Sequence, residues 1–142
     1  PSTTDAYLVY CYTNIGLLHY DLMDYSQALF HCNEASKILQ RILPPDDPDL
    51  ATCYSCVGTI LYHLQDYPNA LRSYEKSLTI WQQRTSSDQS PLAACYNNIA
   101  VVYDDMNDYP KALSYYQKLL DLDRDASSPN SVLLAEVYNR IG

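Results

Sequence analysis

The 142-residue chain is long enough for one domain that buries roughly two thirds of the surface of its unfolded form. Its 17 acidic residues outnumber nine Lys and Arg, and the formal charge of -8 repels phosphate backbones and anionic lipid headgroups. We therefore expect neither nucleic acid nor a membrane surface among its partners. Three Gly and eight Pro, mostly between apolar runs, predict an all-α protein.

The N-terminus also bears on where the protein works. The opening residues, Pro-Ser-Thr-Thr-Asp, lack the basic and apolar parts of a signal peptide. No apolar run approaches the roughly 20 residues that a membrane-spanning helix needs. We expect a cytoplasmic protein.

The first predicted hairpin consists of two helices. The first helix, helix A, carries Tyr12, Ile15 and Gly16 at a spacing typical of one buried stripe. The second, helix B, runs from the segment starting at Asp24 to Ile42, with apolar or small residues at helical spacing. The members of this stripe are Ala28, Leu29, Cys32, Ala35, Ile38 and Leu39.

The same pattern returns every 42 residues. Tyr25, Tyr67 and Tyr109 follow Asp24, Asp66 and Asp108, and 67 - 25 = 109 - 67 = 42. We expect the later B helices to end at Arg84 and Arg124, with Asp66 and Asp108 as N-caps and Pro68 and Pro110 in the first turns. The expected organisation is a single array over residues 1–142, with repeats at about 8–49, 50–91 and 92–133 and a partial repeat at 134–142, whose first helix begins a fourth hairpin.

Small residues recur where the two helices of a hairpin approach each other. Gly16, Gly58 and Ala100 in the A helices face Ala28 and its counterparts in the B helices, so the two backbones can come close. A leucine at Gly58 should overpack this contact.

These residues resemble the tetratricopeptide repeat family. A bulky residue at Tyr12, Tyr54 and Tyr96 precedes the small one, and helix B carries alanine followed by Cys32, Tyr74 or Tyr116. The 42-residue length and the Asp-Tyr-x-x-Ala-Leu segment are most similar to the kinesin light chain type. The resemblance implies a right-handed α-α superhelix, built here from three helical hairpins plus the first helix of a fourth, that binds a protein or peptide.

In this family the A helices line a concave groove. The resemblance therefore assigns partner binding to the helix A residues outside the buried stripe, and amides, hydroxyls and rings there suit an extended peptide. These residues are Thr13, Asn14, Leu17, Tyr20 and Asp21; Ser55, Cys56, Thr59, Tyr62 and His63; Asn97, Asn98, Val101, Asp104 and Asp105; and Asn139 and Arg140.

The distribution of charge indicates which peptide fits. Eight of the nine basic residues lie on the predicted B helices, and only Arg140 lies on an A helix. The family members that bind a chaperone's C-terminal carboxylate or an acidic cargo peptide need cations on helix A. We therefore expect a basic or uncharged peptide.

Several groups resemble chemical sites, and each has a simpler interpretation. Cys53 and Cys56 form a C-x-x-C pair, but Cys53 occupies the repeat position of Cys11 and Cys95, so we expect no zinc and no disulfide. The run from Asp46 to Asp49 lacks the Gly and Glu of a calcium loop and is better explained as a helix cap. The three histidines have no nucleophile beside them. We expect no catalytic residue, metal or cofactor.

Two other functions stay open. The array is alternatively a structural spacer or oligomerising module, and self-association through the exposed terminal repeat fits that alternative. It is also compatible with a regulatory module in a larger multidomain enzyme.

Overall fold

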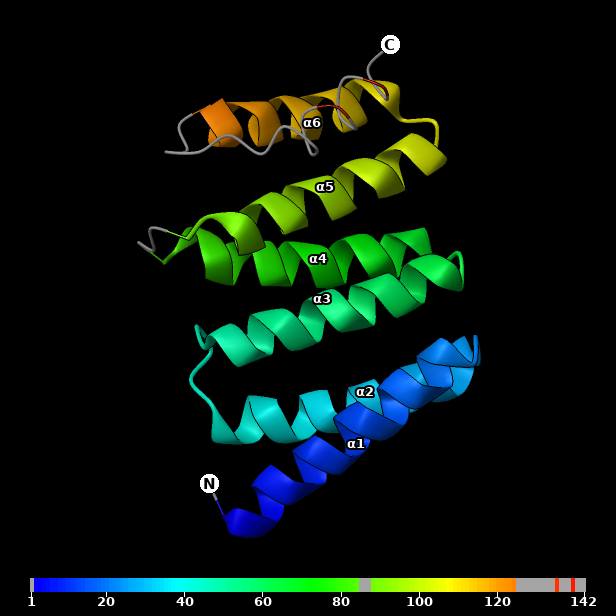
Figure 1. The fold of residues 1–142 in the computed structure, drawn as a ribbon, viewed down its shortest axis with the longest axis vertical. Coiled ribbons are helices and arrows are strands. Elements are labelled where there is room, and N and C mark those ends of the chain that lie inside the picture. Colours follow the sequence, from blue (N-terminus) through cyan, green and yellow to red (C-terminus); the bar gives the residue numbers. More distant parts are fainter. Residues whose placement is uncertain (1, 85–87, 125–134, 136–138, 140–142) are drawn as a thin grey trace. The chain divides into compact units, whose positions relative to one another are not determined.

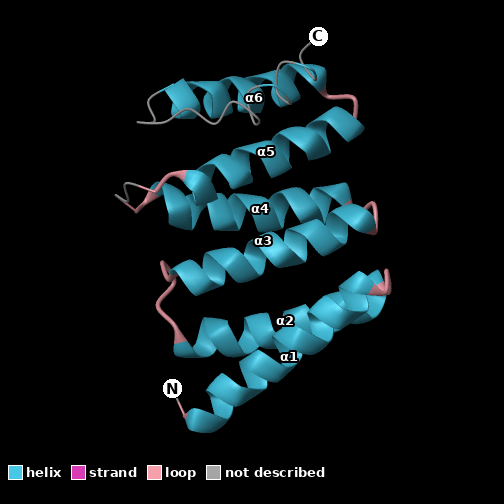
Figure 2. Cartoon of the chain, viewed as in Figure 1, coloured by secondary structure: helices cyan, strands magenta, loops and turns pink. Residues whose placement is uncertain are grey.

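The computed structural model describes residues 2–84, 88–124, 135 and 139. Within this part of the chain it contains six α-helices and no strand, which confirms the all-α prediction (Figure 1, Figure 2). The predicted start of a fourth hairpin at 134–142 falls outside the described residues, apart from Ala135 and Asn139. The helices are α1 (Thr3–Asp21), α2 (Tyr25–Ile42), α3 (Pro48–His63), α4 (Tyr67–Gln82), α5 (Ser90–Asp105) and α6 (Tyr109–Arg124).

The chain divides into two compact units, residues 1–84 and 85–142. In the first unit α1 packs against α2 as hairpin 1, α3 packs against α4 as hairpin 2, and α2 packs against α3 to join the two hairpins (Figure 1). In the second unit α5 and α6 form hairpin 3. The odd-numbered helices are thus the predicted A helices and the even-numbered ones the B helices.

Each hairpin turns through a residue with left-handed backbone geometry. Met23, Gln65 and Asn107 have φ values of 59°, 60° and 60°, and they stand 42 residues apart. In the first turn the amide of Asp24 donates to the carbonyl of His19 at 2.8 Å, and the amide of Met23 donates to that of Tyr20 at 2.9 Å. These two bonds form the Schellman motif that ends a helix.

The aspartate after that residue begins the next helix. Asp24 and Asp66 are the N-caps of α2 and α4, and their carboxylates accept from the amides of Gln27 and Asn69. The Asp108 carboxylate accepts from the amide of Lys111 at 3.4 Å in the same way. One aspartate therefore closes helix A and opens helix B, which confirms the predicted caps.

The ends of the other helices also follow from local chemistry. Asp47 is the N-cap of α3 and accepts from the amide of Asp49 at 2.9 Å, which confirms the capping role expected for the acidic run. Helix α4 ends at Gln82, two residues before the predicted Arg84. The amide of Arg84 instead donates to the carbonyl of Trp81 at 3.2 Å, because the chain tightens into a turn there.

The interiors of the hairpins are closely packed around the small residues. A Cβ atom at Gly16 would lie 2.8 Å from Cys32 Sγ, and one at Gly58 would lie 2.8 Å from two ring carbons of Tyr74. Ala28 and Ala70 are fully buried on the facing helices. This confirms the prediction that glycine and alanine allow the backbones to approach.

The junction between hairpins 1 and 2 has its own apolar cluster. Leu50, Ala51 and Ile80 are buried there, and Leu39 and Leu43 of α2 pack against them. In hairpin 3, Ala100, Ala112, Tyr116 and Leu119 form a separate buried cluster.

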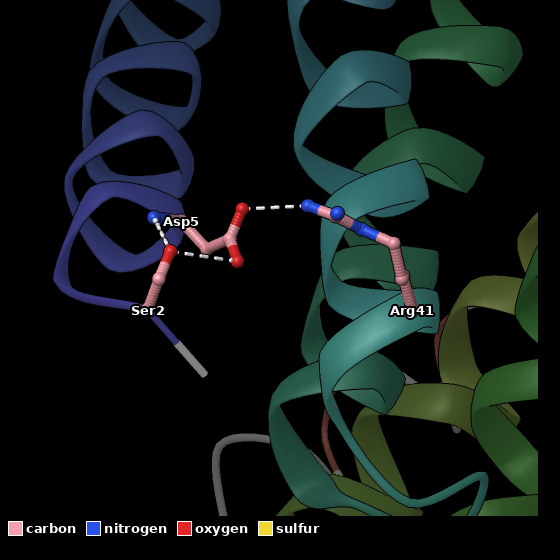
Figure 3. A network of polar contacts seen from close by, with 3 residues as sticks. All are labelled: Ser2, Asp5 and Arg41. Carbon is pink, nitrogen blue, oxygen red and sulfur yellow. Dashed lines mark hydrogen bonds and ion pairs between the residues drawn. The ribbon is translucent and has the colours of Figure 1, made fainter.

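A polar network joins the start of α1 to the end of α2 (Figure 3). The Ser2 hydroxyl donates to the Asp5 carboxylate at 3.0 Å, and Arg41 Nη2 donates to the other carboxylate oxygen at 2.6 Å. The Ser2 hydrogen bond, and next to it the Arg41 charge, hold the pKa of Asp5 below its ordinary value. The network fixes the open end of hairpin 1.

Candidate partner-binding surface

We call the predicted binding residues of one A helix a row. The first two rows lie on α1 and α3 of the first unit, and they meet near the C-terminal ends of these helices. Tyr20 Oη of α1 lies 2.9 Å from His63 Nε2 of α3, so one residue of each row is in direct contact. Most of the remaining members are accessible along the two helices. Thr13, Leu17, Asp21, Cys56 and His63 are exposed, and Asn14, Tyr20, Ser55, Thr59 and Tyr62 are half-buried.

Aromatic rings extend this contact into a cluster. The imidazole of His63 stacks on the ring of Tyr25, with centroids 4.8 Å apart and planes at 6°. Tyr20 and Tyr62 approach the imidazole edge-on at 5.5 and 5.4 Å, and Tyr67 lies 5.9 Å from Tyr62. We call these five residues the tyrosine–histidine cluster.

The donor in the hydrogen bond between Tyr20 and His63 depends on which imidazole nitrogen carries the proton. Burial, followed by the nearby Tyr25 and Asp21, raises the pKa of Tyr20, so the phenol keeps its proton. The phenol donates to Nε2 in the tautomer whose proton is on Nδ1, and Nε2–H donates to the phenol oxygen in the other tautomer. The contact between α1 and α3 is therefore available in both tautomers of His63.

Sequence reasoning missed Tyr25 and Tyr67 as members of this surface. Both carry a clear signal, since Tyr25, Tyr67 and Tyr109 recur at 42 residues, but this recurrence indicates the repeat period and not a place on the binding surface. In the structure, Tyr25 also lies 5.6 Å from Tyr20, and Tyr67 repeats that relation to Tyr62.

Three predicted residues have polar groups bonded within their own helix or hairpin. The hydroxyls of Ser55 and Ser77 are 2.7 Å apart, and the Thr59 hydroxyl donates to the carbonyl of Ser55 at 3.1 Å while lying 3.0 Å from Tyr74 Oη. The Asn14 amide donates to the carbonyl of Tyr10 at 2.9 Å. These groups therefore already have hydrogen-bond partners within the chain.

The third predicted row lies on α5 of the second unit. Asp105 is exposed, whereas Asn97, Asn98, Val101 and Asp104 are half-buried. In the fourth row Asn139 is exposed, and Arg140 lies outside the described residues.

The charges of A and B helices differ strongly. Helices α1, α3 and α5 contain no Lys or Arg, whereas α2, α4 and α6 carry all the basic residues of the described helices. Some of these cations lie over helix A tyrosines. Lys76 Nζ is 5.2 Å from the ring centroid of Tyr54, and Lys111 Nζ is 5.1 Å from that of Tyr103.

Cys32 and Cys53 behave as packing residues, whereas Cys11 and Cys56 are exposed. Burial raises the pKa of both Cys32 and Cys53 to about 11, so neither is a thiolate at neutral pH. Cys53 Sγ donates weakly to the carbonyl of Cys32 at 3.9 Å, across the junction of α2 and α3. In the part of the chain that the structure describes, no three His, Cys, Asp or Glu residues are placed to share a metal ion.

No described helix combines the length and apolar character that crossing a membrane requires.

Comparison with family models identifies the repeats. One tetratricopeptide repeat model matches residues 54–125, and a second matches residues 8–49. The first match covers half of the chain, so the chain belongs to the tetratricopeptide repeat family. Both models are of the kinesin light chain type, which confirms the resemblance identified from the sequence. Proteins of this family generally mediate protein–protein interactions, typically as scaffolds without enzymatic activity.

Solved structures confirm the fold. BtubC (BKLC) from P. vanneervenii superposes with a TM-score of 0.82 at 19% identity, covering 97% of this chain and 58% of that one. The N-terminal domain of stress-induced protein-1 from C. elegans gives a TM-score of 0.72 at 16% identity, covering 99% of this chain and 100% of that domain. The TPR domain of Arabidopsis FLU gives 0.73 at 20% identity, covering 85% and 99%. No curated protein sequence matches the chain significantly.

Proposed function

We propose that the chain is a protein-interaction scaffold whose A helices bind a basic or uncharged peptide segment of a partner. The predicted residues of α1 and α3 form the main contact surface in this proposal, together with the tyrosine–histidine cluster. The third row on α5 contributes to the same function if the three hairpins form the single array that the 42-residue period predicts.

The observation that carries the proposal is the separation of charge between the two kinds of helix. Helices α1 and α3 carry Asp5, Asp21 and Asp49 and no Lys or Arg, so an acidic peptide meets no compensating cation there. Asp5 is already paired with Arg41, and Asp49 lies in the first turn of α3. Of these three acids, Asp21 is the one that adjoins the cluster in sequence, next to Tyr20, and it is exposed.

The cluster gives this surface a second kind of contact. Tyrosine rings bury much apolar area with few rotatable bonds, and their faces attract cations. The pairing of Tyr20 with His63 also holds α1 and α3 together at the point where a peptide would cross from one helix to the next. Preorganisation of this kind lowers the entropy cost of binding.

The test is fluorescence anisotropy with three labelled peptide pools of equal length, enriched in lysine, in serine or in glutamate. We expect the lysine and serine pools to bind, and the binding of the lysine pool to weaken as salt is added. Tight, salt-sensitive binding of the glutamate pool alone would overturn the proposal.

A pair of charge-reversal variants locates the site. Asp21→Lys should weaken the binding of selected lysine-rich peptides roughly tenfold, because an attraction becomes a repulsion. Asp46→Lys makes the same change of charge at an exposed position between hairpins 1 and 2 and should leave affinity within about twofold. Equal losses in both variants would mean that only net charge matters and that no site exists on α1 and α3.

A further inference from the structure

His63 stands at the centre of the proposed contact surface. It lies in the last turn of α3 and is exposed, and its imidazole contacts a side chain from each helix of hairpin 1. The Tyr20 hydroxyl of α1 is bonded to Nε2, and the Tyr25 ring of α2 stacks on the imidazole. A change in the charge of His63 therefore occurs where a peptide on this surface would pass from α1 to α3.

The other repeats have an acid at this position. The residues 42 positions before and after His63 are Asp21 and Asp105, and all three side chains are exposed. At no other position of the predicted rows do all three hairpins carry an Asp, Glu or His. Histidine is the residue whose charge changes closest to neutral pH. Hairpin 2 thus has a titrating group where hairpins 1 and 3 have a fixed negative charge.

A proton on His63 adds charge without removing a contact. Both nitrogens of a protonated imidazole are donors, and the phenol oxygen of Tyr20 can accept the bond from Nε2. An imidazolium stacked on the face of Tyr25 gains a cation–π attraction, and the C-terminal end of a helix such as α3 favours positive charge. The cluster therefore accommodates the proton, and what changes is the charge that a partner meets.

The other ionisable groups beside the cluster, apart from its own tyrosines, differ in their surroundings. Asp21, Asp24 and Asp66 each adjoin one of the tyrosines in sequence. Asp24 and Asp66 cap α2 and α4, and Asp24 also lies 3.4 Å from Nδ1 of the half-buried His19. Burial raises the pKa of the Cys56 thiol on α3, which therefore stays neutral. Asp21 is thus the exposed acid of the surface without a capping role, and its attraction for a cation is what a charged His63 would oppose.

We infer that His63 sets the charge selectivity of the surface on α1 and α3. Neutral His63 leaves the surface acidic and suited to a basic segment, whereas protonated His63 places a cation there that repels such a segment. The inference rests on the proposed function, because it concerns the same surface. An imidazole gains its proton between about pH 8 and pH 5, while lysine keeps its charge throughout. The chain thus binds a basic partner at neutral pH and releases it on acidification.

Two substitutions separate the charge of His63 from its shape. His63→Gln keeps a polar side chain that cannot be protonated, and His63→Lys carries a positive charge at every pH of the test. The matched control adds Asn33→His to His63→Gln, which returns the third histidine at an exposed position of α2, eight residues after Tyr25. Circular dichroism melting checks that each variant folds.

The measurement is fluorescence anisotropy of the whole chain with a selected lysine-rich peptide and with the serine pool, from about pH 7.5 to about pH 5.5 at constant low salt. Affinity of the parent chain for the lysine-rich peptide should fall about three- to tenfold over this range, and affinity for the serine pool should stay within about twofold. His63→Gln should lose this dependence, with or without Asn33→His. His63→Lys should bind the lysine-rich peptide weakly already at neutral pH.

Three results would each overturn the inference: no fall in the parent chain, an equal fall in His63→Gln, or its return when Asn33→His is added. Parent-like affinity of His63→Lys at neutral pH would contradict it as well. Failure of the proposed function has a different signature, because then no pool, or the glutamate pool alone, binds the parent chain at neutral pH. That result would overturn both proposals.

Discussion

Hairpins 1 and 2 follow the same sequence plan but have different surroundings. Helix α3 is enclosed between α2 and α4, and hairpin 2 fills its interior with the ring of Tyr74. The main packing partner of α1 in this unit is α2. In hairpin 1, Cys32 occupies the repeat position that Tyr74 occupies in hairpin 2. In a repeat protein the same residue at the same repeat position therefore contributes differently to stability, because each hairpin depends on its neighbours.

The largest test of this comparison replaces one leucine in each hairpin. Leu50→Ala removes a side chain that is 2% exposed at the centre of the junction cluster, and we expect a loss of about 2–5 kcal/mol in the free energy of unfolding. Leu8→Ala, at the equivalent position, should cost less than about 1 kcal/mol at low protein concentration. Urea denaturation followed by circular dichroism measures both. Similar losses would contradict the comparison.

Overpacking the hairpin interiors should give the next largest effect. In Gly58→Leu the new side chain meets the buried ring of Tyr74, so we expect a loss of about 1–3 kcal/mol. Gly16→Leu meets Cys32 Sγ, a smaller group than the tyrosine ring, so the loss should be smaller. Thermal unfolding of the two variants measures the order, and a larger loss for Gly16→Leu would reverse it.

The turns provide a test in the direction of higher stability. Asn107 occupies the left-handed position in hairpin 3, where asparagine is tolerated well, whereas hairpins 1 and 2 have Met23 and Gln65 there. Gln65→Asn and Met23→Asn should each stabilise the chain by a few tenths of a kcal/mol, up to about 1. A shift of the urea midpoint to higher concentration measures the gain, and Asn107→Gln should produce the opposite shift.

The smallest effect concerns the polar network of Ser2, Asp5 and Arg41 in hairpin 1. Because the pKa of Asp5 is lowered in the folded state, its contribution is fully present above the ordinary value of 3.8 and is lost as pH falls through the lower folded value. Arg41→Gln keeps the Ser2 hydrogen bond and removes the charge. We therefore expect the stability difference between this variant and the parent chain to shrink as pH falls below 4, as measured by thermal melts. A difference that is constant from pH 7 to pH 2 would contradict the expectation.

Much of this fold was predictable because the residues that recur every 42 positions determine local structure, such as helix caps and first turns. Asp24, Asp66 and Asp108 each cap the helix that follows, and proline is favoured in the first turn of a helix. The left-handed turns were harder to predict, since methionine and glutamine give no hint of positive φ. Only the alignment of Met23 with Asn107 contains that information.

The candidate surface was less predictable than the fold. The family resemblance assigns Ser55 and Thr59 to the binding surface, but their hydroxyls contact Ser77 and Tyr74 across the hairpin. The participation of Tyr25 depends on where the next hairpin places His63, and a single repeat does not contain that information. Leu8 and Leu50 are the same residue type at the same repeat position, so the sequence does not show that Leu8 is exposed and Leu50 is buried.

The aspartate shared by the two helices of each hairpin limits where the chain can change in length. The connection from α1 to α2 has Leu22 and Met23 before the cap at Asp24, and the backbone amide of each of these three residues donates a hydrogen bond to α1. One added residue would separate the end of one helix from the start of the next. Pro44, Pro45 and Asp46 are exposed and lie outside both helices, so a tag or an insertion belongs there. A scaffold engineered from this chain can lengthen the connection between hairpins 1 and 2 but not the turn within a hairpin.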